Sequence, residues 1–103
     1  MAFRVEIAEP AELDINEAAL YIASDSPSAA FRWNTELWQL ILSLREMPAW
    51  FSVIEEAEEL GVPYRSALHF SHRVIFTIDE PANTVYVVRV YHGARRPLTH
   101  KDL

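Results

Sequence analysis

The chain has 103 residues; half of them are hydrophobic and none is cysteine. This length favours one domain, residues 1–103, with a modest core, and the lack of cysteine excludes disulfides and thiolate metal sites. A net charge of −6 argues against binding nucleic acid through bulk charge. We find no signal peptide and no apolar run long enough to span a membrane, so we expect a cytoplasmic protein with no membrane partner.

The first half of the chain predicts a strand followed by two helices. Apolar and polar residues alternate over residues 3–7, which is typical of a short strand. Apolar stripes predict one helix over residues 10–23 and another over residues 27–45, with Ser26 as the N-cap of the second. The connection between the helices is so short that they must form an antiparallel hairpin.

A second apolar line on the longer helix consists of Phe31, Trp38 and Leu42. We favour packing of this line against the first helix or against residues 50–60. The alternative is an exposed patch that receives a partner helix or a second copy of the chain.

The segment after Pro48 predicts a third, short helix. Ser52 and Glu55 have the spacing of a capping box, and Gly61 suits the position just after a helix end. We therefore expect a helix over residues 53–60.

The second half predicts three strands, over residues 64–70, 72–79 and 84–92, with a turn at residues 79–83. The order of elements is strand, helix, helix, short helix and three strands. This order indicates an α+β fold in which the helical hairpin packs on one face of a small, largely antiparallel sheet.

The register of the last two strands follows from their apolar pattern. Pairing Asp79 with Asn83 makes one face wholly apolar, whereas a shift by one residue mixes the faces. Arg73 and Arg89 then lie opposite each other on the other face, which no further element is expected to cover. Two adjacent like charges favour an anionic partner there. The residues expected to face the helices are Val74, Phe76, Ile78, Tyr86, Val88 and Val90.

The charge is distributed unevenly along the chain. Residues 1–59 carry twelve acidic residues and three arginines, whereas residues 60–103 carry three acidic and six basic residues. The strand-rich half is therefore the basic half, and its face suits a polyanion or an acidic segment of a partner protein.

The histidines offer limited chemistry. Strict alternation places His92 beside Val90 on the helix side of the sheet, at its rim. We expect His69 and His72, three positions apart, to face opposite sides of the sheet and therefore not to form a metal site.

Four segments, in this order, resemble the RelE/ParE superfamily of bacterial toxins from type II toxin–antitoxin systems. They are the helix that ends at Met47-Pro48, the Leu60-Gly61 approach to Arg65, the strand that begins His72-Arg73, and residues 87–96. The match spans nearly the whole chain. It implies the fold described above, no cofactor or metal, and a cognate antitoxin whose flexible segment wraps the toxin. A homodimer or a toxin–antitoxin heterotetramer is the implied assembly.

Members of this superfamily divide by target. RelE-like members cut messenger RNA in the ribosome without a metal, and ParE-like members, found in plasmid-stabilisation modules, poison DNA gyrase. The long hairpin and residues 93–96 resemble the ParE-like branch. Our leading hypothesis is therefore a ParE-like toxin that acts by binding a protein target such as DNA gyrase and is neutralised by a cognate antitoxin. The residues expected to bind the target or the antitoxin are Arg65, Arg73, Arg89, Tyr91, Arg95, Arg96, Phe31 and Trp38.

The runner-up is a RelE-like endoribonuclease acting on ribosome-bound messenger RNA. By resemblance, Arg73 and His92 match catalytic positions of that branch, but Lys101 is the chain's single lysine. A carboxylate base would come from Glu55, Glu56, Glu58 or Glu59. Convergence of Arg73, His92 and one of these glutamates on a phosphate-sized space would favour the nuclease. A non-toxic binding module of the same fold is the third hypothesis.

Overall fold

The computed structural model describes residues 2–93 and 97–103. A four-stranded sheet has the order β1-β4-β3-β2, in which β1 is parallel to β4 and the other neighbours are antiparallel. The predicted α+β fold class is confirmed. The elements are β1 (Arg4–Ile7), α1 (Glu9–Ala23), α2 (Pro27–Ser43), η1 (Pro48–Trp50), α3 (Ala57–Leu60), β2 (Arg65–His69), β3 (His72–Asp79), β4 (Thr84–His92) and η2 (His100–Asp102).

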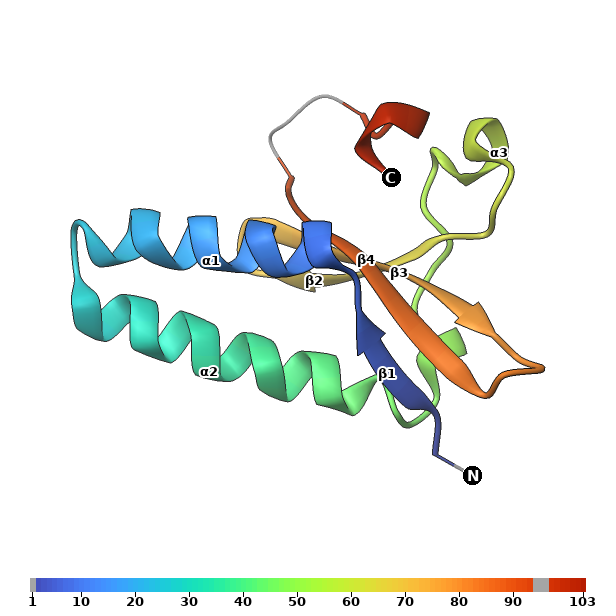
Figure 1. The fold of residues 1–103 in the computed structure, drawn as a ribbon, viewed down its shortest axis with the longest axis horizontal. Coiled ribbons are helices and arrows are strands. Elements are labelled where there is room, and N and C mark those ends of the chain that lie inside the picture. The colour runs from blue at the N-terminus through green and yellow to red at the C-terminus, as the bar shows by residue number, and fades with distance from the viewer. Residues whose placement is uncertain (1, 94–96) are drawn as a thin grey trace.

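Helices α1 and α2 lie side by side as a hairpin against one face of the sheet (Figure 1). Their apolar residues recur at three- and four-residue spacing, so each helix presents one stripe to the strands. Ile15 of α1, Leu37 and Ile41 of α2, and Phe76 of β3 are buried together in this main core. Burial of these side chains is the main force that holds the hairpin on the sheet.

The second helix begins where the sequence predicts. The Ser26 hydroxyl accepts a hydrogen bond from the Ala29 N–H at 3.2 Å, and Pro27 occupies the first turn. Both features satisfy the helix start, since the first backbone N–H groups have no partner within the helix.

Replacing Ser26 with alanine is expected to lower the free energy of unfolding by about 1 kcal/mol, because an N-cap acceptor is lost. Ser52→Ala is the matched control: Ser52 has the sequence pattern of a cap but precedes no helix start in the structure. Its cost should stay within about 0.5 kcal/mol. Chemical denaturation of both variants measures the difference, and equal costs would contradict the assignment of Ser26 as the cap.

The predicted helix over residues 53–60 is wrong in its first half. Only Ala57–Leu60 is helical, and no side chain caps it. The Ile54 N–H donates to the Tyr64 carbonyl at 2.9 Å, and Val53 bridges to Arg65. The backbone before α3 therefore pairs with the sheet edge, which competes with helix formation. The predicted end at Gly61 is confirmed by its left-handed φ of 76°.

The predicted register of β3 and β4 is also wrong. Asp79 pairs with Thr84 instead of Asn83, and the register shifts again between Ile75 and Phe76. Near the turn, Val85 and Val87 are buried against the helices in place of Tyr86 and Val88. The irregularity inserts one extra residue in β4 and returns Val90 to the helix side, as predicted.

The other face of the sheet is covered, contrary to expectation. Figure 1 shows α3 and the C-terminal turn on the side of the sheet away from the hairpin. A second buried cluster joins Ile75 and Tyr91 of the sheet with Leu98 and the α3 segment. Helix α3 has only four residues, too few to give a strong periodic signal, so the sequence pattern did not predict that this segment covers the sheet. The α3-segment members are Ile54, Ala57 and Leu60.

Candidate functional site

On the predicted basic face of the sheet, Arg73 and Arg89 each form an ion pair with a carboxylate from another segment. Arg73 pairs with Tyr91 across the strands and Arg89 with Ile75, so the two arginines are not opposite each other as predicted. Arg73 contacts Glu56 through two hydrogen bonds, of 2.9 and 3.3 Å, and the Glu56 carboxylate also accepts from the Leu98 N–H at 3.2 Å. Arg73 thus fastens the α3 segment and the C-terminal segment to the sheet.

Arg89 is held in a similar way by a carboxylate of α1, near the N-terminus. Its Nε lies 2.7 Å and its Nη2 2.8 Å from the two carboxylate oxygens of Asp14 in α1. The Val90 N–H also donates to Asp14, and Arg89 donates to the Asp102 carbonyl. The hydrogen bond to Asp14 raises the pKa of Arg89, against the opposing effect of burial.

Arg65 binds backbone carbonyls of the segment after α2. Its guanidinium donates to the Ala49 carbonyl at 3.2 Å and to the Phe51 carbonyl at 2.5 Å. Tyr91, a further predicted contact residue, is 2% exposed and lies beneath Arg89. The sheet residues predicted to meet a partner are therefore engaged within the fold, while Arg95 and Arg96 lie outside the described residues.

Glu56 carries a pH-dependent contribution to stability. The hydrogen bond from Arg73 lowers its pKa from 4.5 to about 2, although burial acts in the opposite direction. A depressed folded-state pKa gives stabilisation that is complete above the ordinary pKa and is lost as the pH falls toward the folded-state value.

We expect Glu56→Gln to lower the free energy of unfolding at pH 7 by about 2 kcal/mol, after allowance for solvent screening. The difference from the wild type should shrink as the pH falls from 4.5 toward 2. Urea unfolding across this pH range measures it, with the exposed neighbour Glu55→Gln as the control. A difference that does not change with pH would show that the Glu56 carboxylate contributes no ion-pair stability.

His92 lies on the side of the sheet opposite Arg73. It pairs with His72 across the strands, and the two imidazole rings meet edge to face with centroids 4.9 Å apart. Both rings line the same cavity as Val90, which confirms the predicted helix-side position of His92 at the rim. The nuclease arrangement of Arg73, His92 and a glutamate is not assembled, because Glu56 meets Arg73 on the other face.

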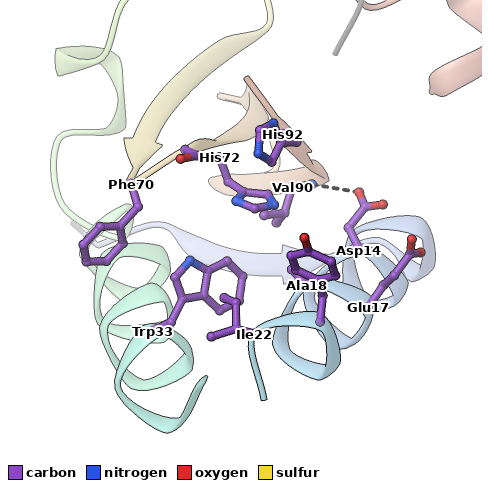
Figure 2. A pocket seen from close by; sticks show the side chains of 11 residues that line it. Asp14, Glu17, Ala18, Ile22, Trp33, Phe70, His72, Val90 and His92 are labelled. Carbon is purple, nitrogen blue, oxygen red and sulfur yellow. Dashed lines mark hydrogen bonds between the residues drawn. The ribbon is translucent and has the colours of Figure 1, made fainter. Parts of the chain in front are cut away.

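The cavity has a volume of about 440 Å³ and opens between α1, α2 and the β2–β3 turn. We call it the aromatic cavity. Figure 2 shows Phe70 and Trp33 on one side, Asp14 and Glu17 on the other, and His72 and His92 projecting from the strands between them. Among its lining residues in the described part of the chain are two carboxylates and no lysine or arginine.

The sequence prediction missed how this cavity is built. His69 and His72 lie on adjacent strands joined by a two-residue turn, so they are cross-strand partners on one side of the sheet rather than on opposite sides. Both rings contact Trp33 at centroid distances of 5.4 Å, and His69 Nε2 lies 3.0 Å from the Trp33 carbonyl oxygen. The signal available in the sequence was the hairpin turn itself, which makes positions 69 and 72 partners.

The apolar line on α2 is exposed. Phe31 is 75% and Leu42 57% exposed, so the favoured prediction that they pack against other elements is wrong. Trp38 is 36% exposed and lies beside Asn16 of α1, at the groove between the helices. We call Phe31, Trp38 and Leu42 the hairpin patch.

Residues 2–93 and 97–103 contain no group of three or more histidine, aspartate or glutamate side chains placed to hold a metal ion. Within the same residues, no helix combines the length and the apolar character that a membrane crossing requires.

The fold and the comparisons define the class of protein. The chain is similar to a toxin–antitoxin structure, the chromosomal ParDE system from P. aeruginosa, with a TM-score of 0.69 and 13% identity over 88% of this chain and 96% of that one. It is also similar to the RelBE2 toxin–antitoxin complex from Mycobacterium tuberculosis, with a TM-score of 0.67 and 21% identity over 92% and 95% of the two chains. The comparison with curated proteins gave no significant match.

Residues 5–97 match the family model described as the ParE toxin of the type II toxin–antitoxin system, parDE. This match covers most of the chain. The chain therefore belongs to the ParE toxin family, within the RelE/ParE superfamily.

Proposed function

We propose that this toxin arrests growth by binding DNA gyrase and that a cognate antitoxin neutralises it. Membership of the ParE family supports this target. The single structural observation that carries the choice over RNA cleavage is the separation of Arg73 and His92 to opposite faces of the sheet. Arg73 is also neutralised by Glu56, whereas metal-free RNA cleavage requires cations that are available to the phosphate.

We propose that the hairpin patch is the surface that contacts gyrase. Phe31 and Leu42 are mostly exposed, although large apolar side chains gain free energy from burial. Exposed apolar side chains that recur along one face of a helix are suited to binding a protein. For Arg65, Arg73, Arg89 and Tyr91 we propose an indirect role, in which they hold the elements that partners contact.

Inhibition of DNA supercoiling by purified gyrase tests the target. The expected result is inhibition by the wild-type protein and loss of inhibition in Phe31→Ala, with an unchanged midpoint of thermal unfolding. The matched control is Leu20→Ala, because Leu20 is an exposed apolar residue on α1, outside the hairpin patch. Phe51→Ala would not serve as a control, because Phe51 packs on the core and its loss would destabilise the fold. Full supercoiling activity at saturating toxin would overturn the proposal.

RelE-like cleavage is the second candidate, because the RelBE2 complex shares the fold. Programmed ribosomes incubated with the protein distinguish it. Cleavage of the messenger RNA that is lost in His92→Ala would replace gyrase binding as the function. Intact RNA together with intact supercoiling would leave the non-toxic binding module.

A further inference from the structure

The aromatic cavity has walls of two kinds that meet around one space. On one side, the rings of Phe70 and Trp33 line the cavity. The His69 ring connects them without lining it: the Phe70 and His69 centroids are 4.8 Å apart, and those of His69 and Trp33 are 5.4 Å apart. Tyr21, which is 81% exposed, also lines the cavity. Its volume of about 440 Å³ lies within the range of small-ligand sites, about 300–1,000 Å³.

The opposite wall is acidic. The Asp14 carboxylate is compensated by Arg89. Glu17, one helical turn further along α1, has an exposed side chain, and within residues 2–93 and 97–103 no cation forms an ion pair with it. Figure 2 shows the Glu17 side chain on the same side of the cavity as Asp14, across from Phe70 and Trp33. Glu17 therefore places a negative charge at this wall that attracts a cation.

Phe70 is held in a costly conformation at the cavity. Its φ of 53° lies in the left-handed region, which a bulky residue rarely adopts, and its side chain is 66% exposed. Glycine or asparagine would satisfy the same two-residue turn between β2 and β3 with less strain. The strained turn therefore holds an exposed aromatic ring at the cavity, where a partner can contact it.

We propose that the aromatic cavity receives an arginine side chain of a protein partner. A guanidinium stacks on aromatic rings through its flat face and donates hydrogen bonds to a carboxylate from its edge. Phe70 and Trp33 supply the rings, and Glu17 supplies the carboxylate. Under the proposed function this partner is the antitoxin; only that identification of the partner rests on the proposed function.

Butylguanidinium is the probe, with neutral butylurea of nearly the same shape as its control and pentanoate as the anion. Titration into ¹⁵N-labelled protein should shift the indole N–H signal of Trp33, while those of Trp38 and Trp50 stay in place because neither residue lines the cavity. We expect butylguanidinium to bind about fivefold more tightly than butylurea, and pentanoate more weakly than both.

Exposed positions allow substitutions that spare the fold. Glu17→Gln should weaken butylguanidinium binding about threefold, whereas Glu12→Gln on another face of α1 should leave it within error. Phe70→Asn removes the ring, suits the left-handed turn, and should weaken binding while the protein stays folded. Equal affinity for butylguanidinium and butylurea, tighter binding of pentanoate, or no effect of Glu17→Gln would each overturn the proposal. None of these results bears on gyrase inhibition, so the two proposals fail separately.

Discussion

Replacing Asp14 with alanine is expected to lower the free energy of unfolding by about 3 kcal/mol, the largest effect we predict for a polar residue. Asp14 and Arg89 have side chains only 14% and 16% exposed, and the carboxylate also accepts a hydrogen bond from the Val90 N–H. Its removal leaves the Arg89 guanidinium without its carboxylate in a place where water only partly compensates. For a domain of this size, the melting temperature should fall by more than about 10 °C.

Asp25→Ala provides the matched control, because Asp25 is an exposed aspartate at the turn between α1 and α2. Thermal and urea unfolding of the two variants give the comparison. A double variant, Asp14→Ala with Arg89→Met, should recover part of the loss, because no buried charge remains without its partner. Equal stability of the Asp14 and Asp25 variants would contradict the structural role of the ion pair.

Replacing Leu37 with alanine is expected to cost about 3 kcal/mol, because this side chain is 0% exposed in the main core. Leu42→Ala, five positions later on the same helix, removes the same atoms from a side chain that is 57% exposed and should cost less than about 0.5 kcal/mol. Denaturation curves of the two variants test which face of α2 meets the sheet. Equal costs would contradict the assignment of Phe31, Trp38 and Leu42 to an exposed surface.

The fold could be predicted from the sequence because its signals are local. Ser26 and the adjacent Pro27 mark a helix start, and the apolar stripe of α2 recurs at Ala30, Trp33, Leu37 and Ile41. The register of β4 was not predictable in this way. Asp79 pairs with Thr84 at the turn. Strand β4 then has one extra residue opposite the junction of Ile75 and Phe76, and this residue changes which side chains face the core. A simple alternation of faces does not contain such an irregularity.

The prediction of an uncovered basic site was wrong for a related reason. The sequence indicated an uncovered row of arginines because the strands supply almost no acidic residues. Their carboxylates come from distant segments: Asp14 precedes Arg89 by 75 positions, and Glu56 precedes Arg73 by 17. Long-range pairs of this kind leave no periodic pattern in the sequence. The strand sequences alone therefore predicted a basic groove, whereas in the molecule Arg73 and Arg89 are ion-paired.

The prediction for His92 succeeded because it needed only alternation along one strand from Val90. The aromatic cavity requires α1, α2, the β2–β3 turn and the ends of β3 and β4 at once, and no local pattern indicates their meeting. The hairpin patch could be recognised in the sequence as a line of apolar residues. Its exposure could not be predicted, because it depends on whether another element packs on that face of α2.

We propose that this toxin acts on gyrase and not on messenger RNA. The most direct measurement follows chromosomal DNA and messenger RNA in the same bacterial cells after induction of the wild-type protein and of His92→Ala. We predict growth arrest with both proteins, double-strand breaks in the chromosome from poisoned gyrase, and messenger RNA of normal length. Arrest with cleaved messenger RNA and unbroken DNA, abolished by His92→Ala, would contradict it.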